Sequence, residues 1–576
     1  MNQAERPRKP NHGQPGATGA TPAGSMKRAQ DRSTGGFGGL LLALGLAGCG
    51  AGGAGEPIPV GQDLPADSQD LMRFLTQATF GPDDFEVAYL GQAGFELWLE
   101  RQRELPPSLH APKLAALAAV GLPVYQQHRE QLWWKLAIEA PDQLRQRMAF
   151  ALSQILVISA ENSSLFDDPL GCARYYDLLV AGAFGNYRDL LGQIALAPQM
   201  GLYLSMLKNQ KQAPETDLRP DENFARELMQ LFTIGLVELE PDGQPRLDAE
   251  GQPVPTYDQA QVEALARVFT GWTYAGASSW EWPTANHAPM ENWPQFHDQG
   301  PKSLVGGLEL PGGQAASLEL DLALDALFEH QNVGPFLARR LIQRFVSSNP
   351  SPAYVTRVAA VFADDGSGER GDLWATLVAL LLDPEARAPR ADQAPGFGKL
   401  KEPLLRITGL WRAFDGRSQS GVYKAWYVDD ELGQAPLRSP SVFNFFTPDY
   451  QPPGVLSQAL LVAPEFQITD ATRITETTNA FDRAIFQGYQ GFAWATPDSV
   501  LMDLGDELAL AGDIPELLEH LGLWLNAGPL SPELAEIVSE HLQSVPLDYG
   551  GLPPGTQRVL EALYLIATSP EAAVQL

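Results

Sequence analysis

The stretch DSQDLMRFLTQATFGP, residues 67–82, indicates most clearly what kind of fold this chain adopts. Its apolar residues follow the i, i+3, i+4, i+7 spacing that places side chains on one face of an α-helix. These residues are Leu71, Phe74, Leu75 and Ala78. Asp67 or Ser68 is suited to cap the start of the helix, and Gly81-Pro82 is suited to end it. The stretch therefore predicts an amphipathic helix packed against other helices.

Similar spacing recurs along the chain. It predicts helices over 142–159, 175–196 (broken at 185–186), 220–232, 259–270, 318–330, 334–346, 352–362, 372–382, 400–414 and 532–547. No run of alternating β-branched residues predicts a large sheet. Residues 278–313 and 439–453 are rich in Pro and aromatic residues, which predicts long irregular loops. We therefore expect a mostly α fold, a large multi-helix body with long irregular loops and little or no sheet.

The N-terminal residues predict export. A positive start at Met26-Lys27-Arg28 precedes the apolar run FGGLLLALGLA, residues 37–47. The run is about half the length that spans a bilayer, as in a signal peptide. It ends in Leu46-Ala47-Gly48-Cys49, which resembles the bacterial lipobox, so Cys49 is the predicted lipidation site. Residues 1–48 are then a signal peptide, for which Met26 is an alternative start to Met1.

The rest of the chain is divided by composition. Residues 49–66 are rich in Gly and Pro and predict a lipidated Cys with a flexible tether. N-terminal, middle and C-terminal helical regions follow, over 67–240, 241–395 and 396–576. Asp is absent after Cys49, since Gly50 stands there, which favours an outer-membrane or cell-surface location over the inner membrane.

The charge of the chain excludes one class of partner. It holds 40 basic and 70 acidic residues, with a formal charge of −30. Such a surface repels the phosphates of nucleic acid, so we expect no nucleic-acid partner. The dispersed acids form a solvated surface or attract divalent cations or cationic partners. In so acidic a chain, Arg147 and Arg344 are expected to pair with carboxylates rather than bind phosphate.

Only two cysteines are present. If Cys49 carries lipid, Cys172 has no partner for a disulfide, and no Cys-based zinc site can form. Cys172 lies at a predicted helix start and is expected to be a small buried thiol rather than a nucleophile. The zinc-protease HExxH, the hydrolase GxSxG, the Walker loop, the dinucleotide glycine pattern and the haem CxxCH are also absent.

Several strings in the chain together carry a family resemblance. They are RFLTQATFGP from Arg73, RQRMAFALSQILVIS from Arg145, AFGNYRDLL from Ala183, RPDENFARELMQLFTIGL from Arg219, ARVFTGW from Ala266, HDQGPK from His297, NVGPFLARRLIQRFV from Asn332, PSVFNFFTPDYQPPG from Pro440 and APEFQ from Ala463. With these strings the chain resembles the bacterial proteins catalogued as domain of unknown function 1800.

The resemblance implies an exported, mainly helical protein with no settled activity. Members are often encoded beside a second secreted family that resembles alkaline phosphatases and sulfatases, so a secreted partner of that kind is expected. Many members carry His where this chain has Phe232. Any metal-binding or proton-transfer role of that His is therefore missing here.

The segment 221–230 holds the strongest candidate site. On a helix, Asn223 and Glu227 share one face, and Glu222 and Arg226 form a second i,i+4 pair. One interpretation is a carboxylate–amide cluster that binds a divalent cation or positions Glu227 as a general base. The other is a polar network that fixes helix packing. The polar cluster comprises Arg219, Asp221, Glu222, Asn223 and Arg226.

His297-Asp298 is the second candidate. An imidazole beside a carboxylate in a loop could act as a base or a metal ligand, and His287 could join the site. Alternatively, adjacent side chains point apart, Asp298 caps a turn, and the pair orders the loop. A site shared with Glu227 requires the two motifs to lie within about 12 Å, because the ligands of one metal surround it closely.

Two functions follow from these features. The first is a cell-envelope lipoprotein that binds a secreted partner or surface component. The second is an extracytoplasmic enzyme that uses Glu227, His297 and Asp298, with a divalent cation as a candidate cofactor, on an envelope or polymeric substrate.

Overall fold

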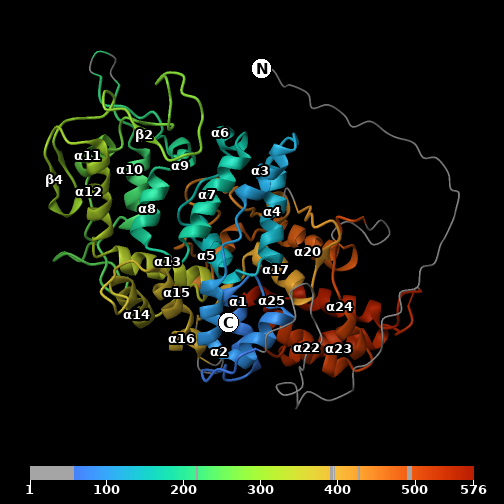
Figure 1. Cartoon of the computed structure of the whole chain (residues 1–576). Helices are drawn as coiled ribbons and strands as arrows, with labels where there is room; N and C mark the ends of the chain where they lie inside the picture. The colour runs from blue at the N-terminus through green and yellow to red at the C-terminus, as the bar shows by residue number, and fades with distance from the viewer. Residues whose placement is uncertain are drawn as a thin grey trace, which may run out of the picture. The chain divides into compact units, whose positions relative to one another are not determined.

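Helices dominate the computed structural model of the chain, which describes residues 58–213, 215, 218–388, 393–394, 396–425, 428–488, 496–549 and 551–576 (Figure 1). These residues belong to one compact unit, Glu56–Leu576. The predicted signal peptide, Cys49 and most of the predicted tether lie outside the described residues. No helix in the described part is long and apolar enough to cross a lipid bilayer.

The helices of the first half run up to a π-helical turn and continue with a second series. The first series is α1 Ser68–Ala78, α2 Asp84–Glu104, α3 Ala111–Ala119, α4 Gln126–Glu139, α5 Gln143–Ser153, α6 Ser163–Phe166, α7 Pro169–Gly182, α8 Tyr187–Ala195, α9 Pro198–Tyr203, α10 Asn223–Glu227 and the π-helix η3 Leu228–Thr233. The second is α11 Gln259–Val268, the 3-10 turn η4 Val305–Gly307, α12 Ala316–Phe328, α13 Val333–Phe345, α14 Pro352–Ala363, α15 Leu373–Leu381 and α16 Pro384–Arg387.

The C-terminal part adds helices and contributes to most of the short strands. The helices are α17 Pro403–Ala413, α18 Val428–Leu432, α19 Val455–Gln458, the 3-10 helix η6 Pro464–Ile468, α20 Ala471–Phe486, α21 Gly505–Leu510, α22 Ile514–Asn526, α23 Pro532–Ser544, α24 Thr556–Ala567 and α25 Pro570–Ala573. The antiparallel strand pairs are β1 Trp272–Thr273 with β2 Glu291–Asn292, β3 Lys302–Ser303 with β4 Glu309–Leu310, β5 Lys399–Leu400 with β8 Val574–Gln575, and β6 Arg417–Ser418 with β7 Val500–Leu501. The predicted mostly α fold with little sheet is confirmed.

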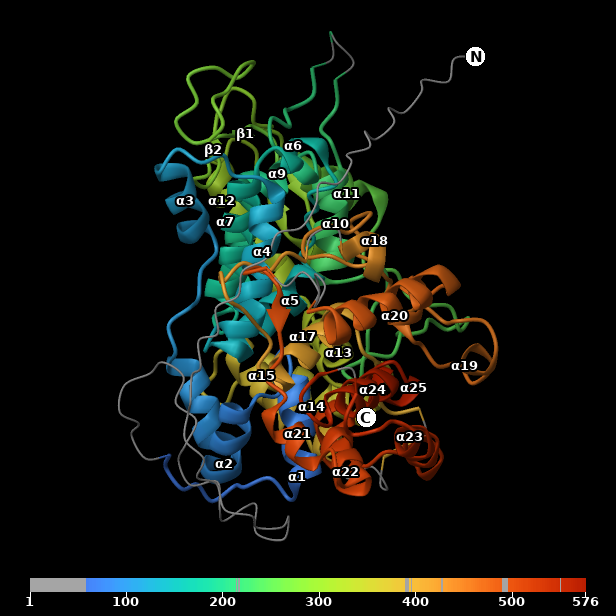
Figure 2. The ribbon, with the colours of Figure 1, turned by 90° about the vertical axis from the view of Figure 1, so that its right-hand side faces the viewer.

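The first predicted helix illustrates why the sequence folds this way. The side chain of Asp67 accepts a hydrogen bond from the Asp70 amide at 2.8 Å and so caps α1. Phe74 and Leu75 on its apolar face are completely buried. The apolar face packs against α2, α5, α15 and α22, so α1 joins helices from both ends of the chain. Figure 2 shows α1 near α22 at one end of the body.

The C-terminal strand β8 holds the end of the chain against its centre. Lys399 pairs with Gln575 and Leu400 with Val574. The side chain of Gln575 also donates hydrogen bonds to the carbonyls of Phe345 (2.7 Å) and Val346 (3.1 Å) at the end of α13. Residues 574–575 are therefore integral to the packing around Lys399.

Candidate functional site

The predicted helix over 220–232 changes its winding at Glu227. It is α-helical over Asn223–Glu227 and then a π-helix over Leu228–Thr233. The Thr233 hydroxyl donates to the carbonyl of Leu228 at 2.6 Å, five residues earlier, which matches the wider turn. π-Helical turns are rare and frequently occur at functional sites. Glu227 therefore lies at a local irregularity in an otherwise regular fold.

The Glu227 carboxyl is buried without a bonding partner. The residue is 7% exposed, and its Oε2 atom has no hydrogen-bond partner among the described residues. Burial raises the pKa of Glu227, and the nearby positive charge of Arg226 opposes this shift. The environment thus favours a protonated carboxyl at a higher pH than in water.

Two tyrosines share the electrostatic environment of Glu227. The Tyr257 hydroxyl is buried and has no hydrogen-bond partner in the described part of the chain. Burial raises the pKa of Tyr257, Arg226 lowers it, and Glu227 raises it. Burial also raises the pKa of Tyr203, to about 12, with a hydrogen bond from Ser439 opposing the shift. Glu227 and Tyr257 are thus two neighbouring polar groups whose hydrogen-bonding capacity is unused within the protein.

The remaining members of the predicted polar cluster lie at the surface. Glu222 and Arg226 form an ion pair of 2.8 Å, with side chains 33% and 40% exposed. Gln259, at the start of α11, donates to Glu222 at 2.9 Å and accepts from Arg226 at 3.2 Å. These contacts fasten α10 to α11.

Three further members of the cluster are exposed, namely Arg219, Asp221 and Asn223. Asp221 accepts a hydrogen bond from the Asn223 amide at 2.8 Å, and its own amide donates to Asn209 at 2.8 Å. Asp221 therefore orders the turn that leads into α10. The candidate site narrows to Glu227 and its neighbours.

His297 takes its carboxylate partner from a distant helix. Its Nε2 lies 3.2 Å from Oε2 of Glu319 on α12, and both side chains are fully buried. Its Nδ1 lies 3.0 Å from the carbonyl of Thr270. Lys302 is also fully buried, 2.7 Å from the same oxygen of Glu319. The sequence gave no indication of Glu319, which is 22 positions away, because no local pattern links the two residues.

Asp298 faces away from this group, as the loop-ordering interpretation expects. Its Oδ1 accepts a hydrogen bond from the Gly300 amide at 2.9 Å, and its own amide donates to Thr270 Oγ1 at 2.8 Å. His287 is bound elsewhere, with Nε2 2.9 Å from Oδ1 of Asp168, the N-cap of α7. The two histidines therefore fasten the 278–313 loop to different helices.

The structure does not bring Glu227 and His297 together. Tyr257, beside Glu227, precedes α11, whereas Thr270, which contacts His297, follows it. The ten residues of α11 span about 15 Å at 1.5 Å per residue. Within the part of the chain that the structure describes, no group of three or more His, Cys, Asp or Glu side chains is arranged to hold a metal ion.

A second polar centre lies deep in the body. We call it the central charge cluster, and it comprises Arg147, Arg344, Lys399, Glu402 and Glu465. All five residues are buried, and they come from α5, α13, β5, the N-cap of α17, and η6. The cluster holds three cations and two carboxylates.

Lys399 connects the two carboxylates of this cluster. Its Nζ lies 3.0 Å from Glu465 Oε1 and 3.8 Å from Glu402 Oε1, and it donates to the Arg344 carbonyl at 3.1 Å. Burial alone would raise the pKa of Glu402, but Lys399, Arg344 and Arg147 hold it below its usual value. Glu402 is thus an ionised carboxylate in the protein interior.

Side-chain amides surround the same centre. Glu402 Oε2 accepts hydrogen bonds from Gln154 at 2.9 Å and Gln434 at 2.5 Å, and Asn444 donates to Gln154 at 3.3 Å. Burial lowers the pKa of Arg147 to about 10, which the charge of Glu402 opposes. The buried charges are therefore held in one network that the sequence predicted only as unassigned arginine–carboxylate pairing.

The predicted buried thiol is present. Cys172 is completely buried, and burial raises its pKa to about 11. Phe232, where many resembling proteins carry His, is also completely buried, and its carbonyl accepts a hydrogen bond from Tyr187 at 2.6 Å. Both residues serve the packing of the body here.

The fold and its buried polar centres define a large helical protein that matches none of the common catalytic motifs. Comparison with known proteins identifies its family. A family model described as protein of unknown function (DUF1800) matches residues 73–574, and the chain belongs to this family. Searches of curated proteins and of solved structures found no match.

Proposed function

We propose that this protein is an exported cell-envelope lipoprotein, anchored through Cys49 and facing outward from the outer membrane or cell surface. The support is the apolar run 37–47 followed by Leu46-Ala47-Gly48-Cys49, N-terminal to the described body. Cells given labelled palmitate should incorporate it into the wild type. The Cys49→Ala variant should lose both the label and membrane association, and a labelled, membrane-bound variant would contradict the proposal.

The body of the lipoprotein, in this proposal, binds a secreted partner through the turn that ends α19. Val455 and Leu460 are 81% and 80% exposed there. The Leu460 amide donates to the carbonyl of Ser457, and the Leu461 amide to that of Leu456. This is the Schellman arrangement, in which a left-handed residue closes a helix.

Leu460 is the observation that carries the partner proposal. Its φ is +57°, a conformation that disfavours side chains with a Cβ and that such turns usually give to Gly. The protein therefore bears backbone strain at a position where the side chain gains little from its own core. Strain of this kind is typical of functional segments. An exposed leucine presented in this way is suited to contact an apolar surface of another protein.

The test measures binding of the secreted phosphatase- or sulfatase-like protein encoded nearby. Leu460→Gly relieves the strain and removes the apolar contact, so affinity should fall at least tenfold while the melting temperature stays level or rises. Val455→Thr should also weaken binding. The matched control is Val60→Thr, because Val60 is similarly exposed at 78% but lies at the start of the described body. Equal affinity in all variants would contradict the proposal.

The second candidate function is an extracytoplasmic enzyme, favoured by the environment of Glu227. A buried carboxyl with a raised pKa and no bonding partner is suited to donate a proton at near-neutral pH. The neighbouring Tyr257 hydroxyl is a further donor without a partner in the described residues. Such a pair would act on an envelope or polymeric substrate whose leaving oxygen needs a proton.

Glu227→Gln separates catalysis from binding, because the amide keeps hydrogen bonding and loses proton transfer. Turnover of purified envelope polymers should fall at least 100-fold, the lower range for general acid catalysis. Glu222→Gln, on the same helix, should stay near wild type. Elemental mass spectrometry of wild type and Glu227→Gln would show whether Glu227 instead holds a divalent cation. Unchanged turnover in Glu227→Gln would exclude the enzymatic role.

A further inference from the structure

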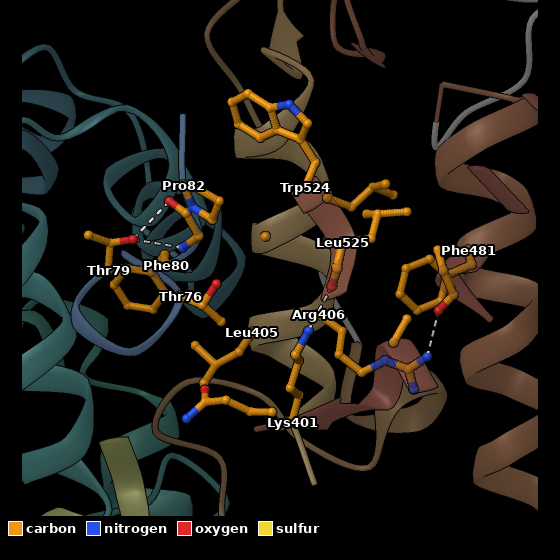
Figure 3. A pocket seen from close by; sticks show the side chains of 16 residues that line it. Thr76, Thr79, Phe80, Pro82, Lys401, Leu405, Arg406, Phe481, Trp524 and Leu525 are labelled. Carbon is orange, nitrogen blue, oxygen red and sulfur yellow. Dashed lines mark hydrogen bonds between the residues drawn. The ribbon is translucent and has the colours of Figure 1, made fainter. Parts of the chain in front are cut away.

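A pocket with an unusual charge lies between helices from both ends of the chain (Figure 3). It has a volume of about 590 Å³, including the space at its mouth that is open to solvent. Its walls come from the end of α1 and the turn after it, from α17, α20, α22 and α24, and from the C-terminal residues around Gln575. The two charged residues that line it are Lys401 and Arg406, and no acidic residue does.

This absence of acid at the pocket is notable because the chain has 70 acidic and 40 basic residues. A positive pocket in a negative protein concentrates anions that the rest of the surface repels. The local field therefore favours an anionic ligand.

Arg406 is held in the pocket by uncharged groups. Its Nη2 donates to the carbonyl of Ala567 at 2.9 Å, and its guanidinium lies 4.9 Å from the centre of the Phe481 ring. Its Nε has no hydrogen-bond partner among the described residues. In Figure 3, Arg406 extends beside Phe481, and the amine of Lys401 points to the Leu525 carbonyl, 2.9 Å away.

Other buried arginines differ in one respect. Arg387 and Arg412 form ion pairs with Asp70 and Asp83. Burial lowers the pKa of Arg406 to about 10, and no carboxylate opposes that shift, whereas Asp70 opposes the shift of Arg387. A buried cation without a counter-charge is costly, and a bound anion would offset the cost.

The other walls of the pocket indicate the rest of the ligand. Leu405, Leu410, Phe481, Trp524 and Leu525 give it an apolar and aromatic lining. Such a lining suits a small hydrocarbon or aromatic group and would desolvate a phosphate dianion without enough compensating donors. The planar guanidinium matches a carboxylate.

We propose that this pocket binds a small organic carboxylate whose apolar body lies against Phe481 and Leu525 and whose carboxylate meets Arg406. The site is separate from Glu227 and from the α19 turn. Its wall includes Gln575, whose strand closes the body, so a bound carboxylate also stabilises the closed C-terminal end.

The first experiment uses the purified protein and pairs of ligands that differ only in charge. Hexanoate and 3-phenylpropionate are compared with 1-hexanol and 3-phenylpropanol by calorimetry and thermal melting. The carboxylates should bind at least tenfold more tightly than the alcohols and raise the melting temperature. Equal binding of acid and alcohol, no binding of the carboxylates at millimolar concentration, or tighter binding of inorganic phosphate would each overturn the proposal.

The second experiment assigns the anion contact to Arg406. Arg406→Gln retains a donor for the Ala567 carbonyl but removes the charge, so the preference for carboxylate over alcohol should disappear. Arg558→Gln is the matched control, because Arg558 also donates to backbone carbonyls, of Ala511 at 2.9 Å and Val545 at 2.6 Å, and does not line the pocket. A preference that survives Arg406→Gln overturns the assignment. If that variant does not fold, the comparison of acid with alcohol in the wild type decides alone.

Discussion

Lys302 Nζ lies 2.7 Å from Glu319 Oε2, and neither side chain reaches solvent. His297 approaches the same carboxylate oxygen at 3.2 Å. One carboxylate on α12 therefore fastens two points of the 278–313 loop, and this explains how a long segment with little secondary structure is held in place. The arrangement is a closed internal contact rather than a surface that a substrate could reach.

Glu319→Gln should destabilise the protein by about 3–5 kcal/mol, because it leaves the Lys302 ammonium buried without its counter-charge. Urea denaturation measures the loss. Glu309→Gln is the control in the same loop, since Glu309 is exposed and bonds only Ser303 at 2.7 Å among the contacts described for it, and should change stability by less than about 1 kcal/mol. The double variant Lys302→Met/Glu319→Leu should lose less than the sum of its parts; strict additivity would refute the coupling.

Glu227→Gln should stabilise the protein at neutral pH. Burial raises the folded-state pKa of Glu227 above the ordinary value of 4.5. Such a group contributes stability below pH 4.5 that is lost as the pH rises through the raised pKa, because folding then requires burial of a charge. The variant should therefore exceed wild type at pH 8 and approach it towards pH 4.5. Chemical denaturation across this range checks the trend, and parallel curves would show that Glu227 does not titrate differently in the fold.

Glu402→Gln should be more damaging than Arg147→Met in the central charge cluster. The first change leaves three cations with one carboxylate, whereas the second leaves two cations with two carboxylates. The loss for Glu402→Gln should be about 3–5 kcal/mol, and that for Arg147→Met smaller by at least about 1 kcal/mol. Denaturation midpoints, or yields of folded protein if one variant is too unstable, give the order. The reverse order would show that Arg147 is paired more strongly than its contacts indicate.

Cys172 should resist thiol reagents in the folded protein. Its pKa is raised to about 11 by burial, so almost no thiolate forms at pH 8, and the thiol is also inaccessible. Mass spectrometry of the peptide that contains Cys172 should show modification by iodoacetamide only under denaturing conditions. Rapid modification in buffer would indicate that α7 opens readily.

Much of the helical fold could be predicted because local signals determine it. The spacing over 259–270 and the start at Ser351-Pro352 correspond to α11 and α14 within one or two residues. The change to a π-helix after Glu227 could not be predicted, since the apolar spacing of 220–232 fits an ordinary α-helix equally well. That change depends on tertiary contacts such as the hydrogen bond from Tyr187 to the Phe232 carbonyl.

The candidate site could be predicted only in part for the same reason. Glu227 was found because it shares a helix with several polar residues, yet its isolation from hydrogen-bond partners is a property of the packed structure. The partner of His297 was expected at Asp298, next in sequence, but is Glu319 on another helix. Lys399 and Glu402 carried no motif at all. A lysine and a glutamate acquire this role only when five separate segments meet.

The pairing of β5 with β8 sets the order in which a nascent chain can finish folding. A chain that emerges N-terminus first, from a ribosome or a translocation pore, brings out Lys399 long before Gln575. Until the later residues arrive, the central charges lack part of their cover and remain hydrated. Completion of the core is thus coupled to the last stage of emergence, and a chain stalled earlier should be open to chaperones and proteases.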